Sequence, residues 1–183
     1  MTGASFIRTV PEGDDRERLV CADCGHIAYE NPKVVVGSVA TLDDRLLLCR
    51  RAIEPRKGFW TLPAGYLELH ETPEDGAKRE AVEEACAAIE IDRLLAVFSI
   101  PRLSQVQLIF RARLASPEIA PGPESTDVRL ARWEEIPWDE IAFPSVRWSL
   151  DAWRRTLDQV DFAPLGNPPG ETGDMRAGRP DHT

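Results

Sequence analysis

Residues 65–87 read GYLELHETPEDGAKREAVEEACA, and this stretch predicts a loop followed by an acidic helix. Thr72 is a suitable N-cap, with Pro73 at the first helical position and acidic residues in the first turn, where they suit the helix dipole. Glutamates three and four positions apart share one face of a helix with 3.6 residues per turn. Three glutamates have that spacing: Glu80, Glu83 and Glu84.

The acidic face needs an explanation, because like charges at this spacing repel one another. A helix face exposed to solvent is the simplest explanation. Mg²⁺ is another, because hard cations take carboxylate oxygens as ligands and keep water molecules for substrate phosphates. Apolar side chains on the other side of the helix can bury it and turn the acidic face toward a cleft. These side chains are Ala81, Val82, Ala85 and Ala88.

The stretch resembles the signature of the Nudix hydrolases, which fixes a glycine, a glutamate and an arginine with three further glutamates at set spacing. Six positions match in register: Gly65, Glu71, Arg79, Glu80, Glu83 and Glu84. Cys86 stands where the signature has its last glycine. Because glycine at a helix C-terminus permits left-handed geometry, we expect a side chain at this position to shift the end of the helix.

Further segments resemble the branch of this family that carries an N-terminal zinc ribbon and acts on ADP-ribose and FAD. They are residues 21–25, 29–33, 50–60 and 142–145. The resemblance covers about residues 6–158 and implies an α/β/α sandwich with a mixed sheet, in which the loop and helix of the signature line the active site. It also implies attack by water on a pyrophosphate bond, which releases AMP from ADP-ribose or FAD.

The resemblance implies a metal site formed by Glu80, Glu83 and Glu84, with Mg²⁺ as the cofactor and Mn²⁺ as a substitute. Arg79 is expected to orient the carboxylates through charge-assisted hydrogen bonds, and Glu71 to be its partner or a further metal ligand. Glu83 and Arg79 are therefore also counted as catalytic.

The general base is expected at Glu124. This residue lies in a loop rich in proline and glycine that looks mobile, where many Nudix hydrolases supply an extra ligand or base. An exposed loop carboxylate is the alternative interpretation.

Basic side chains before the signature can balance the charge of a diphosphate: Arg50, Arg51, Arg56 and Lys57. Arg50 and Arg56, together with Gly65, form the expected substrate-binding set. Trp60 and Phe143 could stack on a base, although aromatic residues beside strands more often fill cores.

The composition predicts one catalytic domain that acts on a small nucleotide. A chain of 183 residues with 43% hydrophobic residues can bury one substantial core. The net charge of −9 argues against a nucleic-acid polymer as partner, because clustered Lys and Arg hold phosphate backbones. No signal peptide, membrane span or disulfide framework is evident, so we expect a cytoplasmic protein without a membrane partner. The sequence leaves open whether the chain forms a homodimer.

We expect a ribbon-like appendage at residues 1–32, a Nudix hydrolase domain at 33–160 and a disordered tail at 161–183. The last of these rests on the glycine and proline content of the tail. Strands are expected near residues 33–42, 46–48, 91–100, 105–114 and 128–133, with a strand running into a loop at 58–69 and helices near 73–87 and 145–160. This mixed pattern is typical of the α/β class.

The appendage holds half of a zinc ribbon, because Cys21 and Cys24 form its only cysteine pair. A structural zinc usually takes four ligands, so no stable Zn²⁺ site is expected within one chain. His26 lies close to the pair but is interpreted as a surface residue.

Three other functions are consistent with part of these observations. A hydrolase of oxidised nucleoside triphosphates would use the same catalytic residues, and only a substrate panel separates it. A nonenzymatic Nudix binding module would be expected to have lost metal ligands, and none is missing here. An RNA-decapping enzyme would need a basic track, which the net charge of −9 does not suggest.

Overall fold

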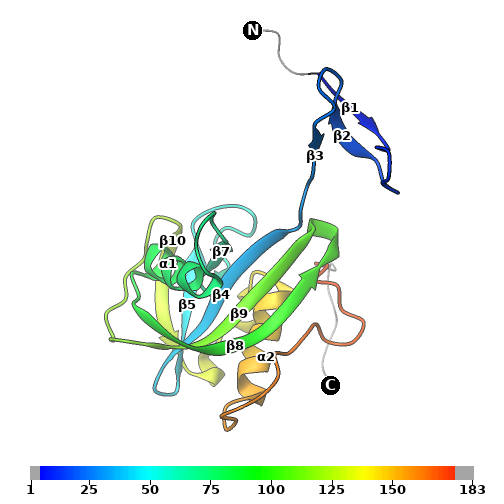
Figure 1. Cartoon of the computed structure of the whole chain (residues 1–183). Coiled ribbons are helices and arrows are strands. Elements are labelled where there is room, and N and C mark those ends of the chain that lie inside the picture. Colours follow the sequence, from blue (N-terminus) through cyan, green and yellow to red (C-terminus); the bar gives the residue numbers. More distant parts are fainter. Residues whose placement is uncertain (1–4, 176–183) are drawn as a thin grey trace. The chain divides into compact units, whose positions relative to one another are not determined.

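The computed structural model describes residues 5–175 and divides the chain into two compact units, Met1–Pro32 and Lys33–Thr183 (Figure 1). Each unit has its own β-sheet. Neither of the two α-helices formed by residues 5–175 is long and apolar enough to cross a lipid bilayer.

The first unit is an antiparallel sheet of three short strands: β1 (Phe6–Thr9), β2 (Arg18–Cys21) and β3 (Ile27–Ala28). Arg18 closes the loop between β1 and β2, because its Nε donates to Asp14 Oδ2 at 2.8 Å. This hydrogen bond lowers the pKa of Asp14 to about 2.

The cysteine pair of the first unit lies on a tight turn after β2. Cys21 and Cys24 are free thiols, and the N–H of Gly25 donates to the carbonyl oxygen of Cys21 at 2.9 Å. The backbone N–H groups of Cys24 and Asp23 lower the pKa of the Cys21 thiol. The turn thus makes the Cys21 thiol easier to deprotonate than a cysteine of ordinary pKa.

The second unit is built on a seven-stranded mixed sheet whose main path runs β10-β5-β4-β9-β8. Its strands are β4 (Lys33–Leu42), β5 (Arg45–Arg51), β6 (Trp60–Thr61), β7 (Ala64–Tyr66), β8 (Ile89–Ile100), β9 (Gln105–Leu114) and β10 (Ser125–Ala131). β4 and β9 are parallel, whereas the other pairs are antiparallel. β4 pairs with β5 only at residues 41–42. Beyond that point the two strands no longer pair with each other, and β7 pairs with β4 while β6 pairs with β5.

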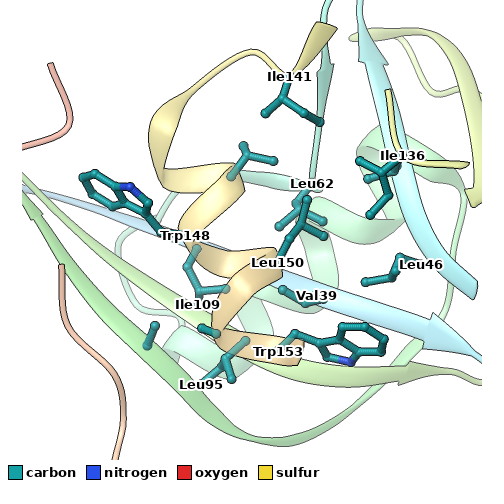
Figure 2. Packing of buried hydrophobic residues seen from close by; sticks show 14 of the residues in the cluster. Val39, Leu46, Leu62, Leu95, Ile109, Ile136, Ile141, Trp148, Leu150 and Trp153 are labelled. Carbon is teal, nitrogen blue, oxygen red and sulfur yellow. The ribbon is translucent and has the colours of Figure 1, made fainter. Parts of the chain in front are cut away.

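Two α-helices, α1 (Pro73–Ala85) and α2 (Pro144–Arg155), cover opposite faces of the sheet. Short 3₁₀ helices lie at Pro101–Leu103, Trp133–Glu135 and Trp138–Glu140. The side chains of β5 show the layering, because Leu46 packs in the cluster formed with α2 (Figure 2). Leu48 belongs to the same cluster. Leu47 and Cys49 point the other way, into the cluster that includes Ala81 of α1. The predicted α/β/α sandwich with a mixed sheet is thereby confirmed.

Helix α1 begins at the predicted cap and ends at an unusual residue. Thr72 Oγ1 accepts the N–H of Asp75 at 3.2 Å. Cys86 follows the helix with φ 49°, in the left-handed region that glycine favours, and the N–H of Ala87 donates back to Ala81 O at 3.1 Å. The cysteine therefore keeps the geometry that the signature assigns to glycine.

Small residues let α1 lie close to the sheet. The buried ones are Gly76, Ala77, Ala81 and Ala85. A Cβ on Gly76 would lie 2.8 Å from a methyl group of Val36 on β4. Val82 and Ala88 are exposed, which differs from the prediction. Val82 lies about 100° around the helix from Ala81, and this rotation carries it out of the buried stripe.

The segment 58–69 and the end of α2 also differ from the prediction. Residues 58–69 form two short strands instead of one, because Pro63 between them has no N–H to donate to a ladder. α2 ends at Arg155 and not near residue 160. The carbonyl oxygen of Thr156 instead accepts a hydrogen bond from Arg111 Nη1 at 2.6 Å.

The chain after α2 lies along β8, whereas the sequence predicts disorder from residue 161. Leu165 exchanges two backbone hydrogen bonds with β8, one with Leu95 at 3.0 Å and one with Val97 at 2.8 Å. The Asn167 side chain accepts the N–H of Ser99 at 2.9 Å and donates to its carbonyl oxygen at 2.8 Å. Few apolar residues are needed, because the free edge of β8 supplies backbone partners. Residues 176–183 of the expected tail lie outside the described residues.

Candidate active site

Two of the three glutamates on the acidic face are buried under the loop that precedes α1. Glu80 and Glu84 are 8% and 5% exposed, whereas the side chain of Glu83 is 55% exposed. The N–H of Ala64 on β7 donates to Glu84 Oε2 at 3.3 Å. A Cβ on Gly65 would overlap the carboxylate of Glu80, so only glycine lets the loop pass this close. Gly65 thus lies against the carboxylate of Glu80, and its contact with substrate stays a prediction.

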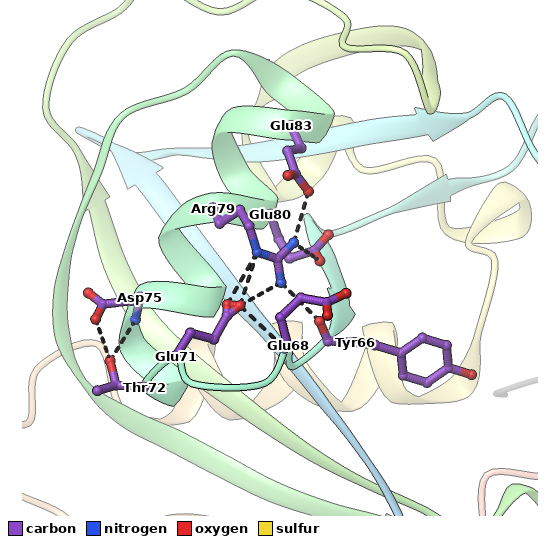
Figure 3. A network of polar contacts seen from close by, with 8 residues as sticks. All are labelled: Tyr66, Glu68, Glu71, Thr72, Asp75, Arg79, Glu80 and Glu83. Atoms are coloured by element: carbon purple, nitrogen blue, oxygen red, sulfur yellow. Dashed lines mark hydrogen bonds and ion pairs between the residues drawn. The ribbon is translucent and has the colours of Figure 1, made fainter.

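Arg79 links the carboxylates into one network (Figure 3). Its Nε and Nη2 donate to Glu71 Oε1 at 3.0 and 2.8 Å. Its Nη1 donates to Glu80 at 2.6 Å and to Glu83 at 2.8 Å. Nη2 also donates to the carbonyl oxygen of Tyr66 at 2.9 Å. Because all three guanidinium nitrogens already have acceptors, this geometry favours orienting the carboxylates over binding substrate.

The buried glutamates resist ionisation. Burial raises the pKa of Glu84 to about 8, and the charge of Glu80 adds to the effect. Burial also raises the pKa of Glu80, against the lowering effect of Arg79. The hydrogen bond from Arg79 lowers the pKa of Glu71. Carboxylates crowded in this way are stabilised when a cation joins them.

The donor set fits a hard divalent cation such as Mg²⁺, which prefers carboxylate oxygens. Among residues 5–175, no three histidine, cysteine or carboxylate side chains already converge on a common point. Arg79 Nη1 contacts both Glu80 and Glu83, so the guanidinium provides the positive charge between them in this structure.

Strand β5 turns Arg51 toward these carboxylates. Side chains alternate along a strand, so Arg51 shares the face of Leu47 and Cys49, which α1 covers. Among the smaller influences on Glu84, the charge of Arg51 lowers its pKa, in agreement with this placement. The Nε of Arg51 donates to the carbonyl oxygen of Pro55 at 2.8 Å, so the loop after β5 holds this side chain.

Arg50 lies on the opposite face of β5, so the structure does not bring this predicted substrate-binding residue to the acidic helix. Its Nε donates to the carbonyl oxygen of Gly58 at 2.7 Å, and its guanidinium carbon lies 5.8 Å from the centre of the Trp60 ring. The alternation of side chains gives the position toward the acidic helix to its neighbour Arg51.

Arg56 joins two loops, the one after β5 and the one before α2. Its Nε donates to the carbonyl oxygen of Ala142 at 3.1 Å, and its guanidinium carbon lies 4.0 Å from the centre of the Phe59 ring. Trp60 is 4% exposed and belongs to the core, so it is not available to stack on a base. Phe143 is half-buried, and the guanidinium carbon of Arg51 lies 5.3 Å from its ring centre.

Glu124 lies on a loop that is attached to secondary structure on both sides, which differs from the mobile loop that its composition suggests. The N–H groups of Ala120 and Gly122 donate to the last carbonyl groups of α1 at 2.9 and 3.1 Å. The N–H of Ala52, just after β5, donates to the carbonyl oxygen of Glu124 at 2.8 Å. The charge of Glu124 contributes to the raised pKa of both buried glutamates. The structure thus brings Glu124 to the acidic helix.

Sequence reasoning missed two contributors to the site, the N–H of Ala64 and the carbonyl oxygen of Tyr66. Both act through backbone atoms, so no pattern of side chains could have revealed them.

Two family models match the chain, one for each compact unit. The model described as the NUDIX domain matches residues 31–156. The model described as Nudix N-terminal matches residues 3–30.

A solved structure, the crystal structure of a NUDIX hydrolase from Nitrosomonas europaea, is similar over nearly the whole chain. It is 44% identical, covers 91% of this chain and 95% of its own, and superposes with a TM-score of 0.85.

Curated relatives match over shorter regions. A MutT-like protein of Streptomyces ambofaciens is 39% identical over 102 residues, which are 56% of this chain and 64% of that protein. An ADP-ribose pyrophosphatase of Methanocaldococcus jannaschii is 29% identical over 119 residues, 63% of this chain and 69% of that protein. The NAD-capped RNA hydrolase NudC of Stutzerimonas stutzeri is 34% identical over 122 residues, 64% of this chain and 42% of that protein. The match thus spans less than two thirds of the Streptomyces and Stutzerimonas proteins.

Proposed function

This chain belongs to the Nudix family of hydrolases, and from that premise we propose that it cleaves the pyrophosphate bond of a nucleoside diphosphate linked to a second moiety. ADP-ribose and FAD are the substrates we expect. Each releases AMP, and the other product is ribose 5-phosphate or FMN. The proposal includes the cytoplasm as the location, where Mg²⁺ and reduced thiols are available.

The observation that carries the proposal is the pair of buried glutamates, Glu80 and Glu84, near enough to Arg51 for its charge to act on Glu84. Buried carboxylates need a positive partner, and a diphosphate needs positive charge from a metal and from basic side chains. The acidic helix and the basic strand end together supply this combination.

We assign Glu80, Glu83 and Glu84 as the residues that would hold Mg²⁺, or Mn²⁺ in its place, and Glu71 as the partner that fixes Arg79. When bound, the ion supplies stabilisation of the charge that develops on the phosphate oxygens.

Glu124 and Arg51 act on the reactants in this proposal. Glu124 accepts the proton of the attacking water, a task that suits an exposed carboxylate on a loop docked against the metal-binding helix. Arg51 binds the phosphate oxygens through charge-assisted hydrogen bonds. Phe143, against which Arg51 lies, offers an aromatic surface to the remainder of the substrate.

The substrate class is supported by the names of two relatives, an ADP-ribose pyrophosphatase and an NAD-capped RNA hydrolase. ADP-ribose and NAD share an adenosine diphosphate group, so recognition of that group would serve both. An RNA that carries an NAD cap therefore belongs in the substrate test, and the net charge of −9 does not decide against it.

The test is product analysis in Mg²⁺ with ADP-ribose, FAD, NADH, NAD-capped RNA, CoA and 8-oxo-dGTP. We expect AMP from ADP-ribose and FAD, with a rate that rises toward alkaline pH because hydroxide becomes more available. Glu83→Gln, prepared in the same way, controls for contaminating hydrolases. Hydrolysis in ¹⁸O-labelled water identifies the phosphorus attacked, because the labelled product carries it.

A hydrolase of oxidised nucleoside triphosphates is the second candidate, favoured by the MutT-like relative. It takes the place of the first if neither ADP-ribose nor FAD is cleaved while 8-oxo-dGTP releases pyrophosphate.

A further inference from the structure

The loop that carries Glu124 is docked on the C-terminal end of α1 through backbone atoms. The N–H of Ala120 donates to Ala85 O at 2.9 Å, and the N–H of Gly122 donates to Glu84 O at 3.1 Å. Carbonyl groups in the last turn of a helix have no donor within the helix, so they need partners from outside. The loop supplies these partners to the helix that holds the proposed metal ligands.

Gly122 is the point of closest approach in this contact. A Cβ built on Gly122 would overlap the carbonyl oxygen of Glu83 and would lie 3.3 Å from the carbonyl carbon of Glu84. The φ angle of Gly122 lies outside the left-handed region. Glycine is therefore needed here for space and not for its conformational freedom.

Glu124 follows two residues later and is held from the other side. The carbonyl oxygen of Gly122 accepts the N–H of Ser125 at 3.0 Å, which closes a turn around Glu124. The N–H of Ala52 binds the carbonyl oxygen of Glu124 at 2.8 Å. The backbone of Glu124 is thus fixed between the end of α1 and the end of β5.

We propose that Gly122 is a positioning residue, which sets the distance between Glu124 and the buried carboxylates by lying against the backbone of α1. The inference rests on the proposed role of Glu124 as general base. A side chain at position 122 pushes the loop away from α1 and moves Glu124 with it. A displacement of about 1 Å at a catalytic group can lower the rate by about 10²-fold.

A double-mutant cycle tests the proposal. The kcat and KM of Gly122→Ala, Glu124→Gln and the double variant are measured with whichever compound of the substrate panel the unaltered chain hydrolyses. Gly166→Ala is the matched control, because no heavy atom lies within 4 Å of a Cβ there.

We expect Gly122→Ala to lower kcat by about 10²-fold and to change KM by less than about threefold, because it displaces the base and leaves phosphate binding in place. Glu124→Gln alone should lower kcat by at least about 10²-fold. In the Glu124→Gln background, Gly122→Ala should lower kcat by no more than about a further twofold, since the two residues act through one carboxylate. Gly166→Ala should match the unaltered chain.

Three results would overturn the inference. An unchanged kcat in Gly122→Ala is the first. The second is an equal loss with and without the Glu124 carboxylate, which would mean that Gly122 acts through α1 alone. Full activity of Glu124→Gln is the third, and it removes the base assignment while the substrate assignment still stands on the products of the unaltered chain.

Ile119→Ala serves if Gly122→Ala does not fold. Ile119 packs against the cluster beneath α1 and anchors the same loop. Loosening this anchor should lower kcat less than Gly122→Ala does, and the loss should again disappear in the Glu124→Gln background. A loss that persists there would count against the inference in the same way.

Discussion

Arg50 and Arg51 are neighbours in the chain but lie on opposite faces of β5, so their replacement should have different consequences. Arg51→Ala removes the basic group whose charge acts on Glu84 and should lower kcat/KM by at least about tenfold. It also removes the exposed hydrogen bond to the carbonyl oxygen of Pro55, so it should lower the free energy of unfolding by less than about 1 kcal/mol. Arg50→Ala removes the hydrogen bond to Gly58 and should lower the free energy of unfolding by about 1 kcal/mol, with kcat/KM nearly unchanged. Steady-state kinetics and urea unfolding of both variants check this. Equal kinetic losses would contradict the placement.

The assignment of Arg51 could not be made from the sequence, for a reason that lies in β5 itself. A strand with one exposed face shows alternating apolar and polar residues, which reveal the direction of each side chain. In β5, Leu46, Leu47 and Leu48 are all buried because helices cover both faces of the sheet. The alternation is hidden, so adjacent arginines at its end cannot be told apart. The glutamates of α1 were predictable, because helical spacing alone puts them on one face.

Glu84 is expected to lower the stability of the fold while it supports hydrolysis. In a chelating buffer, Glu84→Gln should raise the melting temperature by a few degrees, about 3 °C, because it removes a carboxylate whose burial disfavours its charge. The same variant should lower kcat by at least about 10²-fold. Glu83→Gln is the matched comparison, since its exposed side chain should give the loss of activity without the gain in melting temperature. Unchanged activity in both variants would refute the metal assignment.

At the scale of the element, the end of α1 stores conformational strain at Cys86. A side chain in the left-handed region costs about 1–2 kcal/mol, which glycine avoids. Cys86→Gly should therefore raise the free energy of unfolding by about 0.5–1 kcal/mol, and the exposed cysteine side chain gives up no packing. Denaturant unfolding measures the change. Cys86→Ala keeps the Cβ and should show no such gain, so equal gains in both variants would exclude strain as the cause.

The attachment of the segment after α2 to β8 depends on the side chain of Asn167. Asn167→Ala removes both hydrogen bonds to Ser99 and should destabilise this edge by about 1–2 kcal/mol. Hydrogen exchange at the Ser99 amide reports the loss locally. Asn167→Asp keeps the acceptor and loses the donor, so its protection should be intermediate. Unaltered exchange in Asn167→Ala would show that the side chain of Asn167 does not hold the segment.

The helices and the long strands could be predicted, whereas the segments at their edges could not. Caps and hydrophobic periods specify α1 and α2 locally. Residues 161–175 lack an apolar pattern, and their order comes from the exposed edge of β8, which is contributed by residues far away in the sequence. The division of residues 58–69 into two strands also depends on partners elsewhere in the chain, because β6 pairs with β5 and β7 pairs with β4.

At the scale of the whole molecule, the zinc content tests whether the first unit binds a metal. The sequence places one cysteine pair in the first unit, and a structural zinc usually takes four ligands. Chelator-washed monomer should therefore contain well under one zinc per chain by elemental analysis. Cys21→Ser should leave hydrolysis unchanged, because the proposed site lies wholly within the second unit. One zinc per chain that survives washing would overturn the expectation.

Because the chain is synthesised from its N-terminus, the edge of β8 stays uncovered during part of synthesis. β8 is the outermost strand of its sheet, and the residues that cover its edge, Leu165 and Asn167, leave the ribosome about 65 residues after the strand itself. Until they arrive, a nascent chain presents an open strand edge, which is a template for pairing with another unfinished copy. Slow translation late in the message would lengthen this exposure. Recombinant yield should then depend on how quickly the last part of the chain is completed.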